Sequence, residues 1–282
     1  MIIVKWITRK INKKLLRGRR IKSPLLEIAE KKLELEKRKN EITGLVLGSS
    51  HGAYAFDPGM APEGYFNHCS TSQDLYYSYC LFVYSLNVLP HCKMIILFYS
   101  VFSPGYEVQC TSEKHIAAYY NVLYGIPPKY EPDSELLEQK LLCKRGLKAY
   151  TVNCRDTWGF NHLGDYFPAD YPVTDRCKAH LRENQRSNNQ FDYFRKLCRE
   201  AIERGIHIYI VIPPARGDYR AGLPSKDELF FKLIATAKEQ QIKILDFFDS
   251  SIFHADDFGD FDHLTPDGAQ KLTKEIFQLL AM

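Results

Sequence analysis

Three side chains of this sequence have types and spacing that suit acyl-transfer chemistry. Ser50 ends the small-residue turn Gly48-Ser49-Ser50, which directly follows an apolar run. Asp260 and His263 lie three residues apart, just ahead of Thr265-Pro266, a typical helix start. This spacing lets the Asp260 carboxylate accept the Nδ1 proton of His263, so that Nε2 faces outward as a base. A serine hydroxyl beside that base would be an activated nucleophile.

Each of the two segments also has an ordinary structural explanation. Serine is a preferred N-cap residue, so a Gly-Ser-Ser turn is common at the start of a helix. Asp260 and His263 could equally be plain loop residues, and Asp262, beside the histidine, is expected to point elsewhere. Catalysis therefore requires a fold that brings Ser50 and His263 together.

The elements that must position these residues follow from hydrophobic patterning. Apolar runs predict five short strands, over residues 43–47, 65–69, 93–100, 206–212 and 242–247. Amphipathic stretches predict helices over residues 25–40, 189–204, 225–241 and 265–280, the first of them mostly solvated. The alternation predicts an α/β fold, a three-layer α/β/α sandwich around a central parallel sheet of about five strands. Ligands of such sheets bind at the carboxyl ends of the strands, where Ser50 would lie.

The chain is expected to divide into a helical arm over residues 1–40 and one domain over residues 41–282. Residues 105–188 interrupt the strand-helix rhythm with Tyr, Pro, Asn and Arg, and short helices are expected at 112–123 and 134–143. We interpret this segment as an insertion that covers or shapes the site.

The amino terminus has a distinct charge pattern. Residues 1–22 contain nine Lys or Arg and no acid, with apolar residues at helical spacing. Such a segment is typical of a helix on an anionic membrane surface, although a solvated basic terminus fits equally well. Because the net charge of the whole chain is only +4, the remainder is acidic, which argues against nucleic-acid binding.

Other sequence features exclude several classes of protein. The eight cysteines form no C-x-x-C pair, and the histidines show no metal-ligand spacing, so neither a metal nor an organic cofactor is expected. Scattered thiols are typical of a reducing cytoplasm. No apolar stretch is long enough for a membrane span or for a signal peptide. We therefore expect a cytoplasmic protein, with residues 1–22 in contact with the inner face of the membrane.

Taken together, a serine after the first strand and Asp-x-x-His before the last helix resemble the SGNH, or GDSL-like, hydrolase superfamily. The resemblance covers residues 43–280, with a loosely matched middle. It implies a flavodoxin-like fold in which Ser50 is the nucleophile, His263 the base and Asp260 its partner.

The sequence departs from the pattern of this superfamily at two oxyanion positions. Ser72 stands where the second block normally has a glycine whose N–H faces the oxyanion. The asparagine of the third block is missing, and Ser100 or Ser103 would have to substitute for it. His51 is a further candidate for substrate binding or oxyanion contact, unless it is simply a polar residue in the first turn of a helix.

The resemblance implies a serine esterase. The Gly-Ser-Ser turn and the serine-rich third block are similar to divergent branches that act on bacterial surface polymers, as O-acyl esterases or O-acyltransferases. The expected substrate is thus an O-acyl ester, such as an acetyl ester, on a carbohydrate. Two alternatives stay open: an O-acyltransferase of polysaccharide biosynthesis, and a catalytically inactive binding module with the same fold.

Overall fold

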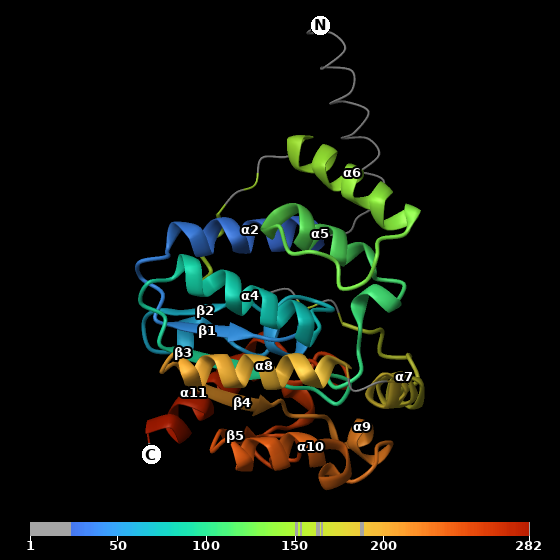
Figure 1. The fold of residues 1–282 in the computed structure, drawn as a ribbon. Helices are drawn as coiled ribbons and strands as arrows, with labels where there is room; N and C mark the ends of the chain where they lie inside the picture. Colours follow the sequence, from blue (N-terminus) through green and yellow to red (C-terminus); the bar gives the residue numbers. More distant parts are fainter. Residues whose placement is uncertain are drawn as a thin grey trace, which may run out of the picture.

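The computed structural model describes residues 24–149, 152, 154–161, 164, 166–186 and 189–281, so the basic segment 1–22 lies outside the described residues. A sheet of five strands forms its centre (Figure 1). The strands run in the order β2-β1-β3-β4-β5, and every neighbouring pair is parallel. Their bounds are β1 Gly44–Leu47, β2 Tyr65–Asn67, β3 Met94–Phe98, β4 His207–Ile212 and β5 Lys243–Asp246. This flavodoxin-like order confirms the predicted α/β fold class.

The sheet is buried on both faces because its strands are apolar at successive positions. Alternate side chains of one strand enter different cores. Leu45 and Leu47 of β1 belong to the larger core, whereas Val46, between them, belongs to the smaller one. The larger core is covered by α2 Pro24–Lys37, α4 Leu75–Val88, α8 Asn189–Glu203 and α10 Lys226–Glu239; the smaller one by α3 Ser50–Ala53 and α11 Pro266–Ala281.

Helix α2 differs from the predicted solvated helix. Leu25, Ile28 and Leu35 are buried in the larger core, and Lys31 donates a buried hydrogen bond to the backbone carbonyl of Cys69. This buried face is not evident from the sequence, because Glu and Lys residues lie between its apolar residues. The long side chains of these charged residues extend past the apolar ones to polar partners. The proposed boundary at residue 40 therefore separates α2 from the core on which it packs.

The insertion at residues 105–188 contains three helices, α5 His115–Tyr124, α6 Ser134–Ala149 and α7 Val173–Arg186. Helix α5 packs between α2 and α6, whereas α7 lies at the end of the sheet toward which the strand arrows point (Figure 1). Asn184 of α7 donates a hydrogen bond to the carbonyl of Val101, just after β3. Neither helix expected in this segment corresponds to α7.

The remaining elements are short: α9 Gly217–Ala221 and the 3-10 turns η1 Pro58–Met60, η2 Val108–Cys110 and η3 Ala255–Asp257. Among the helices that the structure describes, none combines the length and apolar character needed to cross a bilayer.

Candidate active site

Ser50 is the first residue of α3, directly after the carboxyl end of β1. The turn before it depends on Gly48, whose φ is +144° and whose added Cβ would lie 2.8 Å from the Cβ of Phe98 on β3. Ser49 is the N-cap of α3 and accepts a hydrogen bond from the N–H of His51 at 3.4 Å. The side chain of Ser50 is thus held at the sheet edge, with 9% of the residue exposed.

The loop between η3 and α11 carries the other two predicted residues. Gly259 donates its N–H to the carbonyl of His263 at 2.9 Å, which closes the loop. Asp260 shapes its interior, because its Oδ1 accepts the N–H groups of Asp262 at 3.1 Å and His263 at 2.9 Å. Oδ2 of Asp260 accepts the Nδ1 proton of His263 at 2.9 Å and the N–H of Phe167 at 3.1 Å.

Asp260 is ionised in this setting. Burial acts to raise its pKa, but the hydrogen bonds from His263 and from the N–H of Asp262 lower that pKa below its usual range. A carboxylate only accepts hydrogen bonds, so Nδ1 of His263 carries the proton and Nε2 has a free lone pair. This is the tautomer that a general base needs.

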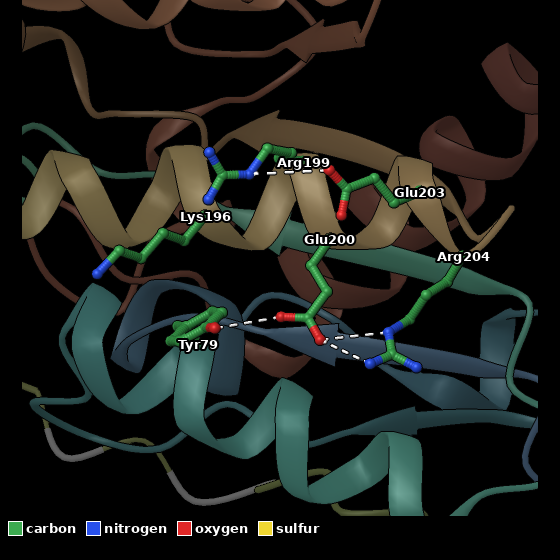
Figure 2. A pocket seen from close by; sticks show the side chains of 6 residues that line it. All are labelled: Tyr79, Lys196, Arg199, Glu200, Glu203 and Arg204. Atoms are coloured by element: carbon green, nitrogen blue, oxygen red, sulfur yellow. Dashed lines mark hydrogen bonds and ion pairs between the residues drawn. The ribbon is translucent and has the colours of Figure 1, made fainter.

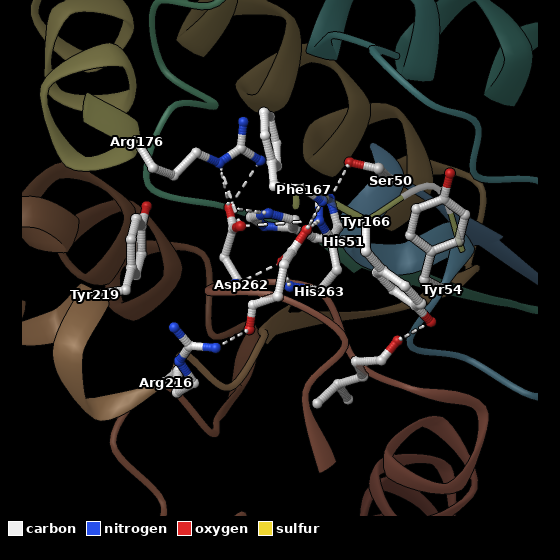
Figure 3. Close-up of polar contacts among 12 residues, drawn as sticks. Ser50, His51, Tyr54, Tyr166, Phe167, Arg176, Arg216, Tyr219, Asp262 and His263 are labelled. Carbon is white, nitrogen blue, oxygen red and sulfur yellow. Dashed lines mark hydrogen bonds and ion pairs between the residues drawn. The ribbon is translucent and has the colours of Figure 1, made fainter. Parts of the chain in front are cut away.

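The two segments meet at Ser50. Nε2 of His263 lies 2.8 Å from the Oγ of Ser50, so the serine hydroxyl donates to the imidazole (Figure 3). The hydrogen-bonded series Ser50, His263, Asp260 has the geometry of a Ser-His-Asp triad. The structure therefore brings all three predicted catalytic residues together.

His51 and Asp262 form a second buried pair beside the first. Nε2 of His51 lies 2.8 Å from Oδ2 of Asp262, and the rings of His51 and His263 are in edge contact with centroids 4.9 Å apart. Asp262 was expected to point elsewhere, but its carboxylate stays inside the site, with Oδ1 3.8 Å from Nδ1 of His263. Nε2 of His51 is hydrogen-bonded to Asp262 and not to Ser50. This nitrogen is therefore not available for the predicted contact with a substrate or an oxyanion.

The two predicted oxyanion serines lie in different surroundings. Ser72 has a left-handed backbone, with φ of +57°, and its hydroxyl donates to Oε2 of Glu113 at 2.6 Å. Ser100 is buried, and its N–H donates to the Oγ of Ser103 at 2.8 Å. The hydroxyl of Ser100 has no hydrogen-bond partner among the described residues and faces a small cavity that His51 also lines.

Several residues around this site were not singled out from the sequence. Arg176 of α7 donates to both oxygens of Asp262, and Tyr54 and Tyr166 lie on the Ser50 side of His263 (Figure 3). The ring centroid of Tyr54 is 5.3 Å from that of His263. The closeness of Asp262 to Asp260 in the sequence was the one available signal for the second pair.

A metal ion is the other ligand that this cluster might suggest, because His51, Asp262 and His263 have ligand atoms within 4.8 Å of one another. Most of their donor atoms are already engaged, although Nδ1 of His51 has no hydrogen-bond partner among the described residues. The guanidinium of Arg176 occupies both oxygens of Asp262, and the two nitrogens of His263 bind Ser50 and Asp260. The residues present therefore suit hydrogen-bond chemistry better than metal binding.

An open groove of about 370 Å³ lies elsewhere, between α4 and α8 (Figure 2). Its charged side chains are paired with one another: Glu200 with Tyr79 and Arg204, and Arg199 with Glu203. None of its lining residues takes part in the cluster around Ser50.

Among known proteins, this chain is similar to solved structures in its fold. No family model matches the chain, and no curated protein matches it. A protein from Desulfitobacterium hafniense described as lipolytic and of the G-D-S-L family is 10% identical, with a TM-score of 0.43, over 84% of this chain and 99% of that one. An acylhydrolase from Bacteroides fragilis is 13% identical, with a TM-score of 0.42, over 89% and 92% of the two chains.

A protein from Streptococcus pneumonia described as a platelet activating factor is 12% identical, with a TM-score of 0.43, over 96% of this chain and 99% of that one. The solved structures that this chain resembles thus include a protein described as lipolytic and of the G-D-S-L family and one described as an acylhydrolase, at low identity and over most of its length.

Proposed function

We propose that this protein is a serine esterase that transfers the acyl group of an ester to Ser50 and then to water. The observation that carries the proposal is the hydrogen-bonded series from Ser50 Oγ through His263 to Asp260, with distances of 2.8 and 2.9 Å. A serine, a base within hydrogen-bond reach and a carboxylate that orients the base are the parts that nucleophilic acyl transfer requires.

In the first half-reaction, Ser50 Oγ attacks the ester carbonyl while Nε2 of His263 takes the hydroxyl proton. Asp260 stabilises the imidazolium that forms and keeps its ring oriented. The tetrahedral intermediate then expels the alcohol, which receives the proton from His263, and an acyl-serine remains. Water attacks the acyl-serine by the same steps, releasing the carboxylic acid and restoring Ser50.

The backbone N–H groups of Ser50 and Ser72 are the proposed oxyanion donors. The N–H of Ser50 is in the first turn of α3, where amides have no intrahelical acceptor. The left-handed backbone of Ser72 supports its match to the family's glycine, because glycine adopts a positive φ without steric cost. Ser100 is retained as a third candidate donor.

For the substrate we propose an O-acyl ester, such as acetyl, on a carbohydrate. The ring of Tyr166 is partly exposed on the Ser50 side of the site and offers an apolar face for a sugar ring. Tyr54, 4% exposed, packs against that ring with a centroid distance of 6.1 Å. Faster cleavage of an O-acetylated oligosaccharide than of a long-chain p-nitrophenyl ester would support this class. The reverse preference would indicate a lipid ester.

The activity itself is tested by labelling with a fluorophosphonate, which reacts with activated serines. Wild-type protein should gain one adduct on Ser50, identified by peptide mass, and Ser50→Ala and His263→Ala should not. Ser49→Ala is the matched control, because it removes the neighbouring N-cap serine, at a cost of about 1 kcal/mol in stability, but leaves the nucleophile. An unlabelled wild-type protein would favour the inactive binding module.

Hydrolysis and transfer are distinguished with p-nitrophenyl acetate in the presence of oligosaccharide acceptors. Release of free acetate is expected of the esterase, whereas acetate that appears only on the acceptor would identify an O-acyltransferase.

The segment 1–22 is proposed to hold the enzyme at an anionic membrane surface. Protein with residues 1–22 should sediment with vesicles containing anionic lipid at low salt, and protein without them should not. Equal sedimentation of both would contradict this role.

A further inference from the structure

A second set of buried polar side chains lies directly beside Ser50 and His263 and has no step in the proposed reaction. It consists of His51, Asp262 and Arg176 (Figure 3). His51 follows Ser50 in the chain, and Asp262 precedes His263. Two hydrogen bonds of 2.8 Å, Ser50 to His263 and His51 to Asp262, thus connect the same two segments side by side.

Asp262 is a buried anion with a single cationic partner close to it. Only 2% of its side chain is exposed, and burial alone would raise its pKa. The charge of Arg176 and the hydrogen bond from His51 instead hold that pKa well below its usual range. Burial lowers the pKa of His51 despite Asp262, so this imidazole is neutral and donates its Nε2 proton to the carboxylate.

Arg176 reaches the carboxylate from the insertion. Its Nε lies 3.2 and 3.1 Å from the two oxygens of Asp262, and its Nη2 lies 2.9 Å from Oδ2. The guanidinium also stacks on Phe167, at 4.6 Å from the ring centroid. One turn further along α7, Nδ1 of His180 lies 3.6 Å from Oδ2 of Asp262 and is hydrogen-bonded to Tyr219 of α9. Three segments that are distant in sequence therefore meet at one carboxylate.

The contacts among His51, Asp262 and Arg176 affect the relative position of Ser50 and His263 and do not reach the reacting atoms. Asp262 Oδ1 is 3.8 Å from Nδ1 of His263, too far for a hydrogen bond. However, the relative position of a nucleophile and its base must hold to about 0.5 Å, and an error of about 1 Å can cost 10²-fold in rate. The second connection restricts the rotation of the α3 turn against the loop, which the Ser50–His263 bond alone leaves open.

We propose that His51, Asp262 and Arg176 form a positioning clamp, through which helix α7 of the insertion holds Ser50 and His263 in register. The proposal rests on the esterase function proposed above. It assigns the insertion a direct part in assembling the site, and it names three positioning residues outside the Ser-His-Asp series.

The clamp is tested with Arg176→Met, Asp262→Asn and the double variant, all assayed for kcat and KM on p-nitrophenyl acetate. Arg176→Met leaves a buried carboxylate without its cation, and we expect kcat to fall about 10²-fold with little change in KM. The double variant has no unpaired buried charge and should recover at least about tenfold in kcat over Arg176→Met. Single variants with wild-type kcat, or a double variant as slow as the product of the two single effects, would overturn the clamp.

A matched control separates positioning from general stability. Arg38, directly after α2, is 14% exposed and pairs with Glu34 of α2, 2% exposed, whereas Arg176 is 15% exposed and Asp262 2%. Arg38→Met should lower the thermal unfolding temperature but leave kcat of the folded protein unchanged. If it lowers kcat as much as Arg176→Met does, the effect is one of stability and the clamp is refuted.

Replacement of His51 gives a conservative rescue. The side-chain amide of His51→Gln can donate to Asp262 from nearly the place of Nε2, and kcat should stay within about fivefold of wild type; His51→Leu should lose about 10²-fold. Equal losses in both variants would contradict a role through the hydrogen bond. Wild-type protein without a fluorophosphonate adduct on Ser50 would refute the proposed function, and the clamp with it.

Discussion

Asp260 and Asp262 are separated by one residue, yet they bind two different imidazoles. Asp260 Oδ2 is 2.9 Å from Nδ1 of His263, whereas Asp262 Oδ2 is 2.8 Å from Nε2 of His51. Both carboxylates are buried and both have a lowered pKa. Their roles therefore follow from which nitrogen each one faces and not from burial or charge.

Asp260→Asn should lower kcat by about 10² to 10⁴-fold. The amide can donate to Nδ1 of His263 and thereby favour the tautomer that has a proton on Nε2, which cannot accept the proton of Ser50. Steady-state kinetics with p-nitrophenyl acetate measures the loss. Asp257→Asn is the control from η3, just ahead of this loop, because Asp257 pairs with Lys271 at 2.6 Å and should affect stability alone. Equal kinetic losses in both variants would contradict the assignment.

Replacing Ser72 distinguishes a backbone oxyanion donor from a side-chain donor. Ser72→Gly and Ser72→Ala both lose the hydroxyl that binds Glu113, but both keep the N–H. We expect kcat/KM to stay within about fivefold in both, and Gly to be more stable than Ala by about 1 kcal/mol because φ is +57°. Urea unfolding gives the stability difference. A loss of 10²-fold or more in both variants would mean that the hydroxyl is the donor.

His68 should make the stability of the protein depend on pH below neutrality. Burial, with a contribution from Lys31, lowers the pKa of His68 from 6.5 to about 3. The unfolded chain then binds a proton first as the pH falls, so this stability is complete above pH 6.5 and is lost progressively toward pH 3. The slope is about 1.4 kcal/mol per pH unit, and the whole effect is on the order of 5 kcal/mol.

Urea unfolding at several pH values tests this effect of His68. His68→Gln should flatten the slope between pH 6.5 and 4, although buried His51 and His180, whose pKa values are also lowered, keep part of it. His91 is exposed, and His91→Gln should leave the slope unchanged. An unaltered slope in His68→Gln would show that His68 is protonated in the fold.

Two glycines in left-handed conformations should differ in their tolerance of alanine. Gly159 has φ of +79°, and an added Cβ would lie 2.1 Å from the carbonyl oxygen of Asn67 on β2. Gly125 has φ of +71° and no atom near its Cβ position. We expect Gly125→Ala to cost about 1 kcal/mol from backbone strain alone, and Gly159→Ala roughly 3 kcal/mol or more. Similar unfolding midpoints would contradict the close packing of residues 158–160 on the sheet edge.

The strands could be predicted because most of them are apolar runs, buried at nearly every position in β1 and β3, and their ends differ from the predicted ends by only a few residues. Ser50 was identified because parallel sheets collect ligand-binding residues at the carboxyl ends of their strands. Asp260 and His263 were identified from their spacing ahead of the last helix, and the resemblance to the SGNH superfamily joined them to Ser50. The predictions of the strands and of the three site residues both depend on local sequence patterns, which do not change with tertiary packing.

The clamp could not be predicted in this way. Arg176 lies in a strongly polar segment, whose pattern predicts a solvent-exposed arginine. Its contact with Asp262 depends on the packing of α7 against the rest of the domain. The burial of α2 escaped prediction for a related reason, since Lys31 and Glu34 lie on the face of the helix that packs inward.

The packing of α2 has a consequence for where the chain can be shortened. Residues 24–37 precede the first strand and could be taken for a dispensable N-terminal extension. However, Leu25, Ile28 and Leu35 form part of the larger core. A chain truncated at residue 40 would present that apolar surface to water and should aggregate, whereas one beginning at about residue 23 keeps the surface covered. Limited proteolysis should accordingly spare α2, and the folding unit extends some twenty residues beyond the part that carries the recognisable motifs.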